Sequence, residues 1–151
     1  MAGNFSKDLE DTIQSGLPRT LSFELELLRR RSLVPDRRLD AWQIRRTILY
    51  DNLKDEFLIT SNVTVEEGSR TSPMPARVIK GFGGAVTMAA RVDDFHIPLT
   101  PSRSALPYVL RIRGRVEPVE AKGWSWMDRV LFGLSAFGPR KTDWYEQEFD
   151  F

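Results

Sequence analysis

The chain's single histidine follows two aspartates in the segment Asp93-Asp94-Phe95-His96. A carboxylate and an imidazole two residues apart could ligate a metal ion, or act as base and acid in a hydrolytic reaction. Such a site needs further ligands, and the sequence offers no second histidine and no cysteine. We therefore favour a solvated turn after a helix. A hydrolase-type or metal-assisted enzyme using this loop remains the alternative function.

A glycine-rich run, Lys80-Gly81-Phe82-Gly83-Gly84, superficially resembles a phosphate-binding loop. It matches neither the Walker pattern nor G-x-G-x-x-G, and no predicted strand leads into it. We interpret it as part of a weak or kinked helix. The serines lack the nucleophile-elbow context of serine hydrolases. The sequence therefore predicts no catalytic residue, no metal and no cofactor.

Three arginines, Arg111, Arg113 and Arg115, alternate along one predicted strand. Such a basic stripe could bind an anionic lipid headgroup, a glycan or a nucleic acid. Glu24 and Glu26 alternate in the same way on another predicted strand. Opposite charges on neighbouring strands stabilise a sheet by roughly 0.2–1 kcal/mol per pair. We favour this cross-strand ladder over a ligand site.

Residues 124–137 are predicted to form an amphipathic helix whose only charges are Asp128 and Arg129. A helix that covers a sheet needs about 100° of apolar arc, and this one is apolar on more than one face. The surplus could dock onto a partner protein or lie at a membrane surface, where tryptophan is favoured. Plain burial against the sheet is the competing interpretation. The predicted interaction surface combines this helix with the C-terminal segment: Trp124, Trp126, Leu131, Phe132, Trp144, Tyr145 and Phe149.

The composition fits one ordinary domain and excludes several classes of protein. The 151 residues are 41% hydrophobic, enough for a single sizeable core. Lys and Arg number 22 against 21 Asp and Glu, so the net charge of +1 gives no bulk attraction to nucleic acid. The absence of cysteine rules out disulfides and cysteine-ligated metals. No run of about 18 apolar residues is present, so we expect no membrane-spanning helix.

A short helix is predicted over residues 7–15, with Ser6 as its N-cap and Gly16-Leu17-Pro18 as its stop signal. The side chains of this helix that we expect to be buried are Phe5, Leu9 and Ile13. Period-two alternation then predicts strands over residues 19–30, 42–50, 57–60, 108–116 and 144–151. We expect residues 61–75 to form a loop.

A second helix is expected over about 76–90, with Pro75 at its first position and with Val78, Phe82, Val86 and Ala89 on one face. Together these elements predict an α+β fold: one domain with a twisted antiparallel sheet of four or five strands and helices packed on it. One face of the sheet is expected to bury Phe23, Leu25, Ile44, Leu110 and Ile112.

The order of the first elements resembles a bacterial family known only as domain of unknown function 4390. The resemblance rests on residues 15–18, the strand motif at 23–27, the basic turn at 29–31 and a tryptophan-led second strand. Further matching points are 108–112, 141–145 and Phe149.

The resemblance covers nearly the whole chain and implies a periplasmic or other envelope location, with no known activity and no catalytic residue to transfer. Family members typically carry an export signal and a further strand before the first helix. This chain starts with a polar helix instead, so we expect either that an export segment has been removed or that the protein is cytoplasmic. We expect a non-enzymatic, envelope-associated interaction module that binds a protein partner or a membrane surface and no nucleic acid.

Overall fold

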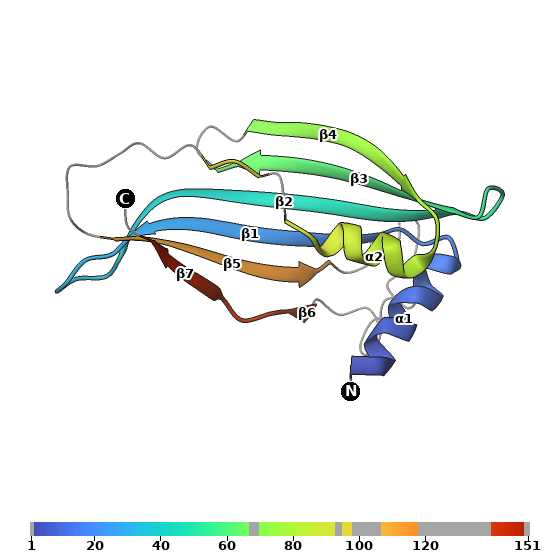
Figure 1. Ribbon diagram of the computed structural model, residues 1–151, viewed down its shortest axis with the longest axis horizontal. Coiled ribbons are helices and arrows are strands. Elements are labelled where there is room, and N and C mark those ends of the chain that lie inside the picture. Colours follow the sequence, from blue (N-terminus) through green and yellow to red (C-terminus); the bar gives the residue numbers. More distant parts are fainter. Residues whose placement is uncertain (1, 67–69, 93–94, 98–106, 118–139, 150–151) are drawn as a thin grey trace, which may run out of the picture.

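The computed structural model describes residues 2–66, 70–92, 95–97, 107–117 and 140–149 (Figure 1). These residues form one antiparallel sheet with two short helices. The elements in chain order are α1 (Ala2–Gln14), β1 (Arg19–Arg29), β2 (Arg37–Asp51), β3 (Glu56–Val65), β4 (Arg70–Ile79), α2 (Phe82–Ala90), β5 (Tyr108–Val116), β6 (Arg140–Lys141) and β7 (Tyr145–Phe149).

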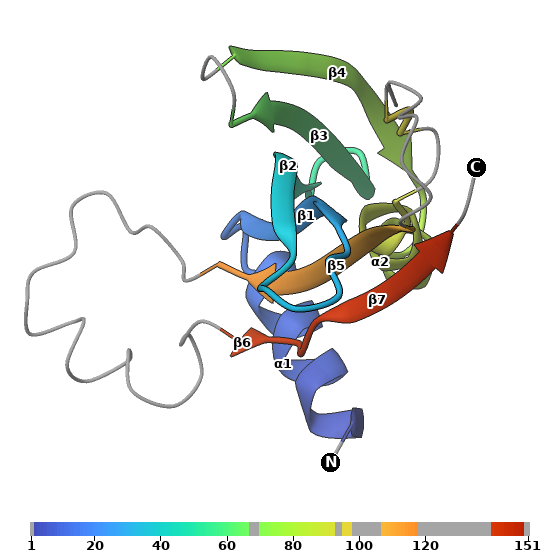
Figure 2. The ribbon, with the colours of Figure 1, turned by 90° about the vertical axis from the view of Figure 1, so that its left-hand side faces the viewer.

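The strands lie in the order β4-β3-β2-β1-β5, and β6 and β7 lie one after the other along the free edge of β5. All pairings are antiparallel. The described part of the chain thus contributes seven strands to the sheet, whereas four or five were expected. Figure 2 shows that the sheet is strongly curled and that α2 lies inside the curl.

The first helix ends as predicted but begins earlier. Gly16 adopts a φ of +86°, the left-handed conformation that ends a helix at low cost for glycine. The prediction of Ser6 as N-cap was wrong, because α1 starts at Ala2 and a capping residue needs a non-helical backbone. Leu9 and Ile13 are buried against the sheet, as expected. The side chain of Phe5 lies outside the described part.

The alternation in β1 places its apolar residues on the face that the helices cover. Phe23 lies opposite Ile44, and Leu25 lies between Trp42 and Ile112. Leu25 is 3% exposed and Ile44 1% exposed, so the predicted register is confirmed. The remaining members of the predicted set, Phe23, Leu110 and Ile112, are only half-buried.

Two expectations about residues 61–80 were wrong. The segment 61–75 is not a loop, because β3 continues to Val65 and β4 begins at Arg70. Pro75 does not begin a helix either, since it lies inside β4. An edge strand tolerates proline because the missing N–H group can face away from the sheet. Most side chains of β4 are exposed, so no alternation of apolar and polar residues marks the strand in the sequence.

The second helix is shorter than predicted and starts after the glycine-rich turn. Gly81, at a φ of +84°, separates the end of β4 from the first residue of α2. Phe82 and Val86 pack against the core around Ala89 as expected. Val78, predicted on the same helical face, lies in β4 and is 57% exposed.

Arg46 explains how α2 is held against the sheet. It lies on the otherwise apolar face of β2 and is 7% exposed. Its guanidinium donates hydrogen bonds to the carbonyl oxygens of Met88 at 2.9 Å and Ala89 at 3.3 Å, and also to that of Arg91. Because the last carbonyls of a helix have no partner within the helix, this buried cation caps the C-terminus of α2.

Candidate functional site

The charged face of the sheet, opposite the helices, carries the arginine stripe found in the sequence. The Nε of Arg111 donates to Glu26 at 2.6 Å, and the Nε of Arg113 donates to Glu24 at 2.9 Å. Arg115 donates to the other carboxylate oxygen of Glu24 at 2.9 Å. The favoured interpretation, a cross-strand ladder, is therefore confirmed.

The ladder continues beyond these strands. The Nε of Arg45 on β2 donates to Glu117 at 2.9 Å, and a second nitrogen of Arg45 pairs with the same carboxylate. Guanidinium nitrogens of Arg38 lie 3.5 Å from a carboxylate oxygen of Glu26 and 3.0 Å from one of Glu66. These three residues line a hollow of about 360 Å³. These arginines are thus engaged with carboxylates, and the face offers a mixed polar surface rather than a cationic one.

The indole ring of Trp144 packs on the guanidinium groups of two arginines of this ladder. Its ring centroid is 4.5 Å from the guanidinium carbon of Arg111 and 4.4 Å from that of Arg113. Cations that pack on an indole are attracted by its quadrupole. A second attachment lies nearby, where Thr142 accepts a hydrogen bond from the Gly114 amide at 3.0 Å and donates its own amide to the Gly114 carbonyl at 2.8 Å. Residues 142–144 therefore fasten the C-terminal segment to β5.

The edge strand β7 follows directly after this attachment. Tyr145 is 65% exposed, and Glu146, Gln147 and Glu148 are exposed as well. Tyr145 was predicted from the sequence as an interaction residue, and in the structure its side chain is accessible next to Trp144. The side chain of Phe149 lies outside the described part, as do Trp124, Trp126, Leu131 and Phe132.

The predicted histidine loop is only partly described. His96 is exposed, and Asp93 and Asp94 lie outside the described residues. Phe95 packs edge-on against Trp42 with a centroid distance of 5.9 Å. Phe95 thus packs against the core, next to the exposed His96.

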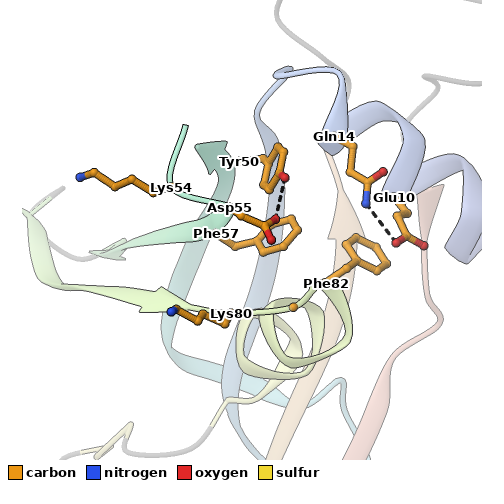
Figure 3. A pocket seen from close by; sticks show the side chains of 9 residues that line it. Glu10, Gln14, Tyr50, Lys54, Asp55, Phe57, Lys80 and Phe82 are labelled. Carbon is orange, nitrogen blue, oxygen red and sulfur yellow. Dashed lines mark hydrogen bonds between the residues drawn. The ribbon is translucent and has the colours of Figure 1, made fainter. Parts of the chain in front are cut away.

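A pocket of about 260 Å³ lies at the other end of the molecule, where α1, the β2–β3 turn and the start of α2 meet (Figure 3). Tyr50 donates its hydroxyl proton to Asp55 at 2.7 Å, and this hydrogen bond, with burial and the nearby carboxylates, raises the pKa of Tyr50. The raised pKa keeps the phenol protonated. In Figure 3 Lys54 and Lys80 point away from this pair.

The floor of this pocket is closed by aromatic packing. Phe57 is 3% exposed, and its ring lies between those of Tyr50 and Phe82. The centroid of the Phe57 ring is 4.8 Å from that of Tyr50 and 6.1 Å from that of Phe82. The arrangement ties the β2–β3 turn to the core. The Tyr50–Asp55 hydrogen bond was not predicted from the sequence, and Asp55 adopts a left-handed φ of +53° that no sequence pattern indicated.

Comparison with known proteins adds a family and no activity. A family model described as "Domain of unknown function (DUF4390)" matches residues 1–147. No curated protein matches the chain, and no solved structure matches it. Among the described residues, no helix is both long and apolar enough to cross a membrane.

Proposed function

The chain belongs to the DUF4390 family, and we propose that it acts as a non-enzymatic, envelope-associated interaction module that binds a protein partner. The binding surface is the C-terminal segment, residues 142–149. The envelope location is inferred from the family's expected setting.

The main support for this proposal is that the indole ring of Trp144 packs on the guanidinium groups of two arginines. Arg111 and Arg113 are each fixed by a glutamate of β1, so the indole packs on a rigid support. The strand that follows is therefore held in place while Tyr145 remains 65% exposed. A preorganised surface loses less conformational entropy on binding, and tyrosine is enriched at protein interfaces.

The charges on the sheet favour a protein over a lipid surface. Arg111, Arg113 and Arg115 are already paired with Glu24 and Glu26. An anionic headgroup would have to displace these carboxylates. A protein strand or loop can bind at the neighbouring edge without disturbing them.

Site-specific photo-crosslinking in intact cells tests the proposal. A benzophenone amino acid replaces Tyr145, and in a matched control it replaces Leu53, which is 98% exposed in the β2–β3 turn. We expect a discrete protein adduct from position 145, recovered in the envelope fraction, and none from position 53. Equal labelling at both positions, or an adduct found only in the cytoplasm, would contradict the proposal.

A further inference from the structure

The two edges of the sheet differ in their capacity to accept another strand. In β4, Pro73 and Pro75 have no backbone N–H group. Pro73 lies opposite Asn62, and Pro75 lies in the irregularity of the β3–β4 register. Prolines on an edge strand remove donors and so hinder edge-to-edge pairing. The β4 edge is therefore protected.

The β7 edge has no such protection. The strand reads Tyr-Glu-Gln-Glu-Phe, so each of its residues has an N–H donor. Its inner edge pairs with β5 from Tyr108↔Phe149 to Ile112↔Tyr145, and in the described ranges nothing pairs with its outer edge. Because N–H and C=O groups alternate in direction along a strand, about half of them point outward. This edge can accept a further strand.

The charge around β7 specifies what kind of strand fits. Asp143 and Glu146 have no ion-pair partner within the described part, and Glu148 pairs with the exposed Arg30 at 2.9 Å. Residues 142–149 contain no lysine or arginine. Complementary charge across an interface selects the partner and speeds association.

We propose that β7 binds by strand addition an extended segment of a partner protein that carries lysine or arginine at alternate positions. This inference rests on the proposed function and supplies its binding mode. A second copy of the chain fits less well. In an antiparallel β7–β7 pair centred on Gln147, Glu146 would face Glu148 of the other copy, and like charges directly opposite destabilise a sheet.

The test uses a blocked peptide, Thr-Lys-Val-Lys-Val-Lys-Thr, titrated into the isotope-labelled full chain. We expect amide hydrogen exchange to slow at alternate residues of 145–149 and to stay unchanged in β4. The same peptide with glutamate in place of lysine should not bind. Glu146→Lys should weaken binding of the lysine peptide about tenfold. Asp11→Lys makes the same change of charge at an exposed acid of α1 and should leave binding unaltered.

Several outcomes would overturn the inference. Equal binding of the two peptides, protection outside β7, or no protection would each do so. Protection of β7 by phosphatidylglycerol vesicles, or by self-association of the chain, would identify a different occupant. If crosslinking at position 145 succeeds and alternate-amide protection is absent, strand addition is wrong and the interaction module stands. If both are absent, both proposals are wrong.

Discussion

Arg46 occupies a position where the alternation of β2 predicts a hydrocarbon side chain. Its guanidinium supplies donors to three carbonyl oxygens at the end of α2. The substitution Arg46→Met keeps a long side chain but leaves those carbonyls without their charged partner. We expect it to lower the free energy of unfolding by roughly 2–3 kcal/mol, measured by urea denaturation. Arg37→Met, at the exposed start of β2, should change it by less than about 0.5 kcal/mol, and equal losses would contradict the capping role.

The hydrogen bond of Tyr50 makes the stability of the fold depend on pH in the alkaline range. Its hydrogen bond to Asp55 raises the pKa of Tyr50 above 10.0, so the folded chain holds this proton more tightly than the unfolded chain. The stabilisation is therefore present below about pH 10 and is lost as the pH rises through the folded pKa. We expect Tyr50→Phe to flatten the fall in urea midpoint above pH 10. Tyr145→Phe, which changes an exposed tyrosine, is the control and should not flatten it.

At the scale of elements, the strands that bury one face could be predicted, and the exposed ones could not. β1 and β2 alternate apolar and polar residues because the helices cover one side of each, and β5 alternates because its apolar face packs in the neighbouring core cluster. β4 is exposed on both faces, so its sequence has no period, and its prolines suggest a loop. Only the pairing with β3, which is a long-range contact, makes it a strand.

The same distinction applies to the candidate site. The ladder between β1 and β5 was predictable because Glu24 and Glu26 alternate in phase with the arginines. The stacking of Trp144 on Arg111 and Arg113 was not, since it depends on where β7 meets β5. Local patterns reveal which face a residue occupies, whereas the register decides which neighbour it contacts.

The prolines of β4 lead to a prediction about solubility. The double substitution Pro73→Thr and Pro75→Thr adds two N–H donors to an exposed edge strand. We expect the variant to self-associate, because an unprotected edge is a template for pairing. Sedimentation velocity at increasing concentration measures this. Ser72→Thr, which raises strand propensity without adding a donor, should remain at the wild-type size, and a double variant that does so too would contradict the protective role.

At the scale of the whole molecule, one face of the sheet forms the core and the other carries the charged ladder. The face inside the curl packs against α1, α2 and the side chains of Val92, Phe95 and Ile97, and the opposite face carries the ladder. Trp144 joins this second face to the C-terminal edge. We therefore expect Trp144 to stabilise that edge locally rather than the fold as a whole.

The substitution Trp144→Ala tests this division. It removes two cation–π contacts, so the free energy of opening β7 should fall by roughly 1–3 kcal/mol. Native-state hydrogen exchange should show faster exchange at 145–149 and little change in β1 to β4. Tyr145→Ala removes a neighbouring exposed aromatic side chain and should have a smaller effect on exchange. Uniformly faster exchange throughout the sheet would instead make Trp144 part of the global core.

The unequal edges of the sheet also set the stoichiometry of any complex. A fibre grows only when each added copy exposes an edge that can accept the next copy. Here one edge accepts a strand, and the other lacks donors at Pro73 and Pro75. Among the described strands, a copy that used β7 to join a neighbour would leave just the protected β4 edge exposed. If β7 binds its partner by the proposed strand addition, addition ends after one step, and we expect no longer assemblies as the concentration rises.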